Sequence, residues 1–165
     1  MQDSKKASFI NAIQENEGLI HKVASFYTDS KEDKDDLVQE IIYALWKSFD
    51  SFKQYAKLST WMYRVAMNVA IFHFKKGKKQ VPAVPINPEL LNVQDTGDSD
   101  TEEKLQLLRY HIQDLNLFDK GILMLYLEDK SHEEIAQIVG ISKSNVGTKI
   151  SRIREKLKRQ VSKQK

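Results

Sequence analysis

Hydrophobic residues recur at spacings of three and four along most of the chain, which is the spacing of one face of an α-helix. Over residues 4–75 this spacing predicts successive helices centred near Phe9, Leu19, Ile41 and Val65. No convincing run of alternating hydrophobic and polar residues predicts a strand. We therefore expect an all-α fold.

The helical pattern stops at a segment of different composition. Residues 81–103 contain all three prolines of the chain and no basic residue. Proline prevents a helix and favours an extended course. We therefore predict a linker here, between an N-terminal helical domain, residues 1–80, and a C-terminal helical domain, residues 104–165.

Four helices are predicted in the C-terminal domain, the first two over Lys104–Asp114 and Leu117–Leu127. The last two are joined by a very short turn. Ser131, with a glutamate three residues later, forms a capping box that begins one of them, and Ser142 caps the other. Gly140 lies where the first of this pair must end in a left-handed conformation. These signals predict a helix-turn-helix.

The second helix of this pair has two different faces. An apolar stripe is predicted to pack inward: Val146, Ile150, Ile153 and Leu157. The other face carries side chains able to contact phosphate oxygens or base edges: Lys143, Ser144, Asn145, Thr148, Lys149 and Arg152. This arrangement favours DNA binding. The alternative is an ordinary helical hairpin whose basic face is only solvated.

Composition narrows the class of protein. The chain has no cysteine, which excludes disulfides and thiolate metal sites and favours a reducing cytoplasm. Its start has no long apolar run, so we expect neither a signal peptide nor membrane insertion. The net charge of +3 is distributed as +3, −6 and +6 over residues 1–80, 81–103 and 104–165. The basic charge is thus local, as a DNA-binding surface requires.

No catalytic or cofactor motif is found. The sequence has no phosphate-binding glycine loop, no nucleophile elbow and no pair of histidines at metal-binding spacing. The four histidines are far apart in sequence: His21, His73, His111 and His132. We expect no enzyme activity, no cofactor, no metal and no small-molecule substrate.

The segment from Phe49 to Asn68 combines aromatic and basic residues. Proteins that hold single-stranded nucleic acid stack bases on aromatic rings and place lysines and arginines along the phosphates. The alternative is that Phe49, Phe52 and Trp61 are core aromatics of a small helical domain. Residue chemistry leaves both interpretations open.

A resemblance to bacterial RNA polymerase sigma factors is carried by three stretches of sequence. The first two, DDLVQEIIYALWKSFDSF and LSTWMYRVAMNVA, resemble conserved region two, and the third, DKSHEEIAQIVGISKSNVGTKISRIREKL, resembles region four. Their order and spacing resemble the small extracytoplasmic-function (ECF) type, which has only these two domains and a linker. The resemblance runs from about Phe9 to Leu157.

This resemblance implies a role for each part. A helix with Asp36, Gln39 and Glu40 would dock on the clamp of the largest β-type polymerase subunit. The helix from Ser142 to Lys156 would bind the minus-thirty-five promoter element. The segment after Phe49 would melt the minus-ten element and capture its non-template strand. The residues carried over for that step are Lys53, Gln54, Lys57, Ser59, Thr60, Trp61, Arg64 and Asn68.

The resemblance also implies the partners. These are core RNA polymerase, through its clamp and flap regions, promoter DNA, and an anti-sigma factor that holds the protein inactive. The second hypothesis is a free-standing dimeric helix-turn-helix regulator, which would need a self-association surface and a palindromic site.

Gly147, inside the recognition helix, costs about 1 kcal/mol of helix stability relative to alanine. It either permits close approach to DNA or is simply tolerated.

Overall fold

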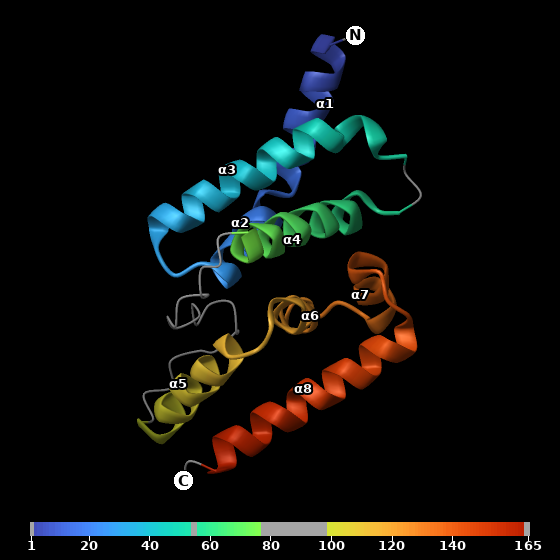
Figure 1. The fold of residues 1–165 in the computed structure, drawn as a ribbon. Helices are drawn as coiled ribbons and strands as arrows, with labels where there is room; N and C mark the ends of the chain where they lie inside the picture. Colours follow the sequence, from blue (N-terminus) through green and yellow to red (C-terminus); the bar gives the residue numbers. More distant parts are fainter. Residues whose placement is uncertain (1, 54–55, 77–98, 164–165) are drawn as a thin grey trace. The chain divides into compact units, whose positions relative to one another are not determined.

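The computed structural model describes residues 2–53, 56–76 and 99–163, and every long element in these ranges is an α-helix (Figure 1). No strand occurs among them, so the predicted all-α fold is confirmed for the part of the chain that is described. The chain divides into two compact units, Met1–Lys79 and Gln80–Lys165.

The N-terminal unit contains α1 (Gln2–Glu15), α2 (Glu17–Tyr27), α3 (Lys31–Ser48), the short 3₁₀ helix η1 (Phe49–Ser51) and α4 (Leu58–Lys76). Helices α2, α3 and α4 pack on one another around a common core. The side chains that are almost fully buried there are Ile20, Val23, Tyr27, Leu37, Ile41, Leu45, Met62, Ala66 and Ala70. Burial of this apolar area is the main stabilising contribution of the unit.

Two helix starts in this unit differ in how they form. The side chain of Ser30 accepts a hydrogen bond from the backbone N–H of Asp33 at 3.1 Å and so caps α3. The sequence predicts that Ser59 or Thr60 caps α4, but the helix already begins at Leu58. Its first turn includes a bond from the N–H of Trp61 to the carbonyl of Lys57, 3.1 Å long. The helix thus starts two or three residues earlier than predicted.

The C-terminal unit contains α5 (Ser99–Gln113), α6 (Leu117–Leu127), α7 (His132–Val139) and α8 (Lys143–Lys163). Helix α8 packs against each of the other three helices. The predicted inward stripe of α8 is confirmed, because its four members are all buried: Val146, Ile150, Ile153 and Leu157. This stripe covers a core built largely by α6, in which every residue from 120 to 125 is buried.

Helix α5 starts earlier than predicted, at Ser99 instead of Lys104. Residues 99–103 of the predicted linker therefore belong to a helix. Acidic residues are frequent in them, and negative charge is favourable at a helix N-terminus. Residues 81–98, the rest of the predicted linker, lie outside the described residues.

Candidate nucleic-acid interface

The helix-turn-helix of α7 and α8 forms as its local signals predict. The hydroxyl of Ser131 accepts from the N–H of Glu134, and the hydroxyl of Ser142 accepts from the N–H of Asn145, both at 3.1 Å. Gly140 ends α7 with φ 79°, in the left-handed region where only glycine avoids strain. Caps and glycine together fix the angle at which α8 leaves the turn.

The outward face of α8 presents the predicted upstream DNA-binding residues. Because the apolar stripe packs inward, the opposite side of the helix is left to solvent. Five of the six predicted residues are exposed and one, Lys149, is half-buried. The exposed ones are Lys143, Ser144, Asn145, Thr148 and Arg152. The structure therefore brings all six together on one end of one helix.

Two of these side chains are held by neighbours. The Nζ of Lys149 lies 3.4 Å from a carboxylate oxygen of Asp119 and 5.3 Å from the ring centroid of Phe118, both on α6. The hydroxyl of Thr148 donates to the carbonyl of Ser144 at 3.2 Å. Lys149 is therefore oriented before any ligand arrives, which lowers the entropy cost of a contact.

Gly147 faces α7 and not the outward face. A Cβ placed on it would lie 3.6 Å from Nδ1 and 3.8 Å from Cε1 of His132, which is ordinary van der Waals contact. The glycine is thus located at the crossing of the two helices. Of the two expectations for this residue, close approach to DNA has no support in this geometry.

The predicted polymerase-docking residues share one face of α3. Asp36, Gln39 and Glu40 are spaced by three and four residues and are all exposed. A carboxylate oxygen of Glu40 lies 3.0 Å from Nδ1 of His73 on α4. This contact ties the end of the docking face to the neighbouring helix, a link that spacing along the sequence did not indicate.

The aromatic residues of the loop after α3 form one cluster. The ring of Phe52 lies 5.2 Å from that of Trp61, and Phe49 lies 6.3 Å from Trp61, edge to face. All three rings are half-buried. Each ring is thus partly packed against the others and partly accessible, which is compatible with both interpretations of this segment. Aromatic pairs in such geometries contribute about 0.5–1.5 kcal/mol each.

The predicted minus-ten residues fall into three groups. Exposed residues lie on the loop and on one face of α4: Lys53, Lys57, Arg64 and Asn68. Ser59 and Trp61 are half-buried, whereas Thr60 is only 4% exposed and packs inside the unit. Gln54 lies outside the described residues. Thr60 thus has no access to nucleic acid in this conformation.

A groove in the C-terminal unit was not predicted from the sequence. It has a volume of about 780 Å³ and is lined by apolar side chains of α5, α6 and α8, including Leu105, Ile112 and Leu157. Arg154 and Lys158 also line it. Lys104 and the acidic Glu155 line it as well. The groove forms only where these three helices meet, so the residue pattern of a single helix could not predict it.

Among the described residues, no group of three or more histidine, aspartate or glutamate side chains is placed to hold a metal ion. In those same ranges no helix is long and apolar enough to cross a membrane.

Comparison with known proteins matches each unit to a family model. The model of Sigma-70 region 2 matches residues 12–80, and that of Sigma-70, region 4 matches residues 121–157. The ECF RNA polymerase sigma-E factor of Escherichia coli (strain K12) is 30% identical over 159 residues, covering 86% of this chain and 81% of the relative. The RNA polymerase sigma factor SigV of Bacillus subtilis (strain 168) is 24% identical over 169 residues, covering 99% and 96%.

Solved structures share the fold. The sigma factor RpoE in a co-crystal structure with the anti-sigma factor NepR, from Bartonella quintana, has a TM-score of 0.66 at 17% identity. That match covers 94% of this chain and 97% of the other. CnrH, in complex with the cytosolic domain of CnrY, gives a TM-score of 0.67 at 17% identity, covering 97% and 91%.

Proposed function

Because the chain belongs to the ECF class of sigma-70 family RNA polymerase sigma factors, we propose how its two units divide the work of promoter recognition. As a sigma factor it directs core RNA polymerase to promoters. The observation that supports this most strongly is the pair of family matches, region 2 followed by region 4, each on its own helical unit. The protein acts as an initiation factor with no catalytic activity of its own, in the cytoplasm where the polymerase works.

The upstream contact is made by α8. Its exposed end enters the major groove of the minus-thirty-five element, where Asn145, Lys149 and Arg152 contact base edges. Lys143, Ser144 and Thr148 contact phosphates and set the register. The support for this assignment is that the six residues gather at the N-terminal end of α8, where five of them are exposed.

The downstream contact is made by the loop after η1 and the first turns of α4. Lys53, Lys57 and Arg64 lie along the phosphates of the non-template strand, and Asn68 contacts a base. Ser59 and Trp61, half-buried, border the place where an unpaired base is received. Gln54 is kept in the set on its sequence position. Thr60 supports the loop from inside.

Partner binding uses two further surfaces. The face of α3 with Asp36, Gln39 and Glu40 docks on the polymerase clamp. The groove between α5, α6 and α8 receives a helical segment of a partner, either the polymerase flap or an anti-sigma factor, since its apolar lining is accompanied by basic residues. Two structural neighbours of this chain, RpoE and CnrH, were solved in complexes with NepR and CnrY.

Charge reversal at Glu40 tests the docking assignment. Glu40→Lys is expected to lower the affinity for core polymerase at least tenfold, because it reverses the charge of an exposed residue in the proposed docking face. The measurement is co-purification and fluorescence-polarisation titration with core enzyme. Glu15→Lys, the same charge change at an exposed position of α1, is the matched control.

Glu40→Lys also breaks the contact between Glu40 and His73, so His73→Gln is a second control. It removes this contact and leaves Glu40 in place. Normal core binding by Glu40→Lys, with its helix content unchanged, would refute the docking assignment. The second hypothesis, a free-standing regulator, would be favoured by a different result. In that case the wild-type protein would not bind core enzyme, would form a dimer, and would bind a palindromic duplex without polymerase.

A further inference from the structure

Helix α1 contacts the promoter-melting loop although most of it precedes the matched family region, which begins at residue 12. The ammonium of Lys5 lies 2.9 Å from a carboxylate oxygen of Asp50 in η1. The same ammonium lies 4.3 Å from the ring centroid of Trp46, near the end of α3. One side chain of α1 thus holds both the last turn of α3 and the start of the loop.

Phe9, one turn further along α1, makes the apolar part of this contact. Its ring lies 5.0 Å from Trp46 and 5.3 Å from Phe49, in both cases edge to face. Phe9 is 8% exposed, so the contact is mostly shielded from water. The Lys5–Asp50 ion pair itself is open to solvent, because the Asp50 side chain is 77% exposed, so the aromatic contacts carry most of the link.

The contacts continue from α1 to the far end of the loop. Phe49 packs against Trp61 in the first turn of α4, and Trp61 packs against Phe52. The loop therefore has its beginning and its end held by one aromatic cluster, which we define as Phe9, Trp46, Phe49, Phe52 and Trp61. Phe9 joins this cluster from α1.

We propose that α1 is a positioning element for strand capture, and that Lys5 and Phe9 are positioning residues that keep the loop in its binding conformation. Neither residue contacts DNA in this account. They act by lowering the number of loop conformations that must be given up when unpaired bases bind. The inference rests on the proposed function of the loop.

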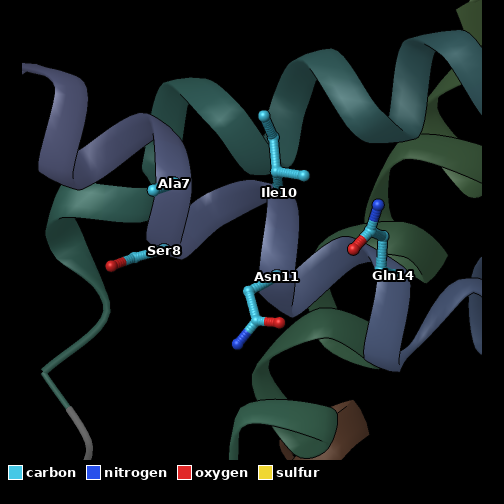
Figure 2. Close-up of a pocket in the computed structure, with 5 residues that line it drawn as sticks. All are labelled: Ala7, Ser8, Ile10, Asn11 and Gln14. Atoms are coloured by element: carbon cyan, nitrogen blue, oxygen red, sulfur yellow. The ribbon is translucent and has the colours of Figure 1, made fainter.

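The face of α1 that points away from the aromatic cluster makes none of these contacts, and exposed Lys6 offers a matched control. This face forms a shallow hollow lined only by residues of this helix: Ala7, Ser8, Ile10, Asn11 and Gln14 (Figure 2). Lys6 is exposed and neighbours Lys5 in sequence. Lys6→Met therefore repeats the charge change of Lys5→Met at a position without the contacts that Lys5 makes with Asp50 and Trp46.

The decisive comparison uses two substitutions that change the net charge of the protein in opposite directions. Lys5→Met removes a positive charge and Asp50→Asn removes a negative one, but both break the same contact. If α1 acts by positioning, both lower the equilibrium fraction of open promoter by about two- to fivefold, the size expected for a solvent-exposed ion pair with a cation–π contact. Lys5→Arg, which keeps the charge and the ring contact, retains opening close to the wild type.

The experiment uses holoenzyme reconstituted with core polymerase on a promoter that the wild-type holoenzyme transcribes, with permanganate reactivity as the measure of opening. Core affinity and closed-complex binding are measured in parallel and are expected to stay unchanged. Opposite effects of the two substitutions would show that Lys5 contacts phosphate directly, and no effect of either would show that α1 is irrelevant to opening. Both results overturn the inference.

The structural link is tested in the free protein. The chain has two tryptophans, and both are in the cluster. In a Trp61→Phe background Trp46 is the one remaining tryptophan. Lys5→Met is expected to shift the emission of Trp46, whereas Lys6→Met is not. An unshifted emission would overturn the contact itself. Failure of the wild-type holoenzyme to transcribe any promoter would instead refute the proposed function, together with the inference that rests on it.

Discussion

Arg152 and Arg154 are neighbours on α8 with different surroundings. Arg152 is exposed on the outward face, whereas the guanidinium of Arg154 lies 5.9 Å from the ring centroid of Tyr126 and lines the groove. At the residue scale the two proposed activities of this helix, DNA binding and partner binding, therefore use different side chains. This separation allows each to be changed alone.

Arg152→Ala is expected to weaken holoenzyme binding to the upstream element by about 1–3 kcal/mol and to reduce discrimination against a scrambled element. Arg152→Lys is the matched control, because it keeps the charge and loses the two-pronged hydrogen bonding. It should retain the salt dependence and lose most of the discrimination. Titrations of both variants at several salt concentrations measure this, and unchanged affinity of Arg152→Ala throughout would exclude Arg152 from the interface.

Lys120 is a charged residue inside the C-terminal unit. It is 1% exposed, and burial lowers the pKa of its amine from 10.5 to about 8. Between these values the unfolded chain binds more protons than the folded chain, so the stability of the unit increases with pH there. Below about pH 8 both states are protonated and the folded state bears the full cost of a buried charge.

Lys120→Met is therefore expected to raise the free energy of unfolding at neutral pH by about 1–3 kcal/mol. The difference between variant and wild type should shrink as the pH rises from about 8 towards 10.5. Urea unfolding followed by circular dichroism, with hydrogen exchange at α6 amides, measures this. Lys104→Met, at an exposed position, should leave stability unchanged, and a variant at Lys120 no more stable than the wild type would contradict the account.

At the element scale, α8 combines a buried stripe with an exposed face that we propose reads DNA, and Gly147 is the residue of lowest helix propensity within it. Gly147→Ala is expected to stabilise the C-terminal unit by about 0.5–1 kcal/mol, because alanine favours the helix and the new Cβ would only touch His132. Upstream-element affinity should not change, since the position faces α7. Hydrogen exchange of α8 amides measures the gain.

Gly18→Ala is the control for propensity alone, since a Cβ there meets nothing within 4 Å. It should stabilise α2 in the N-terminal unit, where both tryptophans report unfolding by fluorescence. Destabilisation by Gly147→Ala with stabilisation by Gly18→Ala would show that the crossing of α7 and α8 needs glycine.

The elements that could be predicted from sequence are those with local causes. The caps at Ser131 and Ser142, the left-handed turn at Gly140 and the buried stripe of α8 all depend on residues within one or two turns. The contacts that could not be predicted join distant residues. Lys5 and Asp50 are 45 positions apart, and no spacing rule relates them.

The same distinction explains the errors of detail. Thr60 has the chemistry of a DNA-binding residue, and its burial follows from the packing of α4 against α2 and α3. The groove of the C-terminal unit requires three helices to meet, so it too lies beyond local patterns. The predicted site residues themselves stay predictions until DNA or polymerase binding is measured.

At the scale of the whole molecule, we propose that the protein holds a promoter at two DNA elements and is attached to polymerase at one surface. In this proposal the C-terminal unit carries the DNA-reading helix, and the N-terminal unit carries both the melting loop and the docking face on α3. Since neither unit alone would supply all three, we expect promoter-specific initiation to require both units in one chain.

In vitro transcription with core polymerase on genomic fragments tests this central claim most directly. We predict that discrete transcripts appear only when the protein is added. These transcripts should be lost with Glu40→Lys and retained with Glu15→Lys. We also predict that the transcribed promoters share two sequence elements, and that Arg152→Ala relaxes the requirement for the upstream one. Transcript patterns that are the same with and without the protein would contradict the claim that this chain directs promoter-specific initiation.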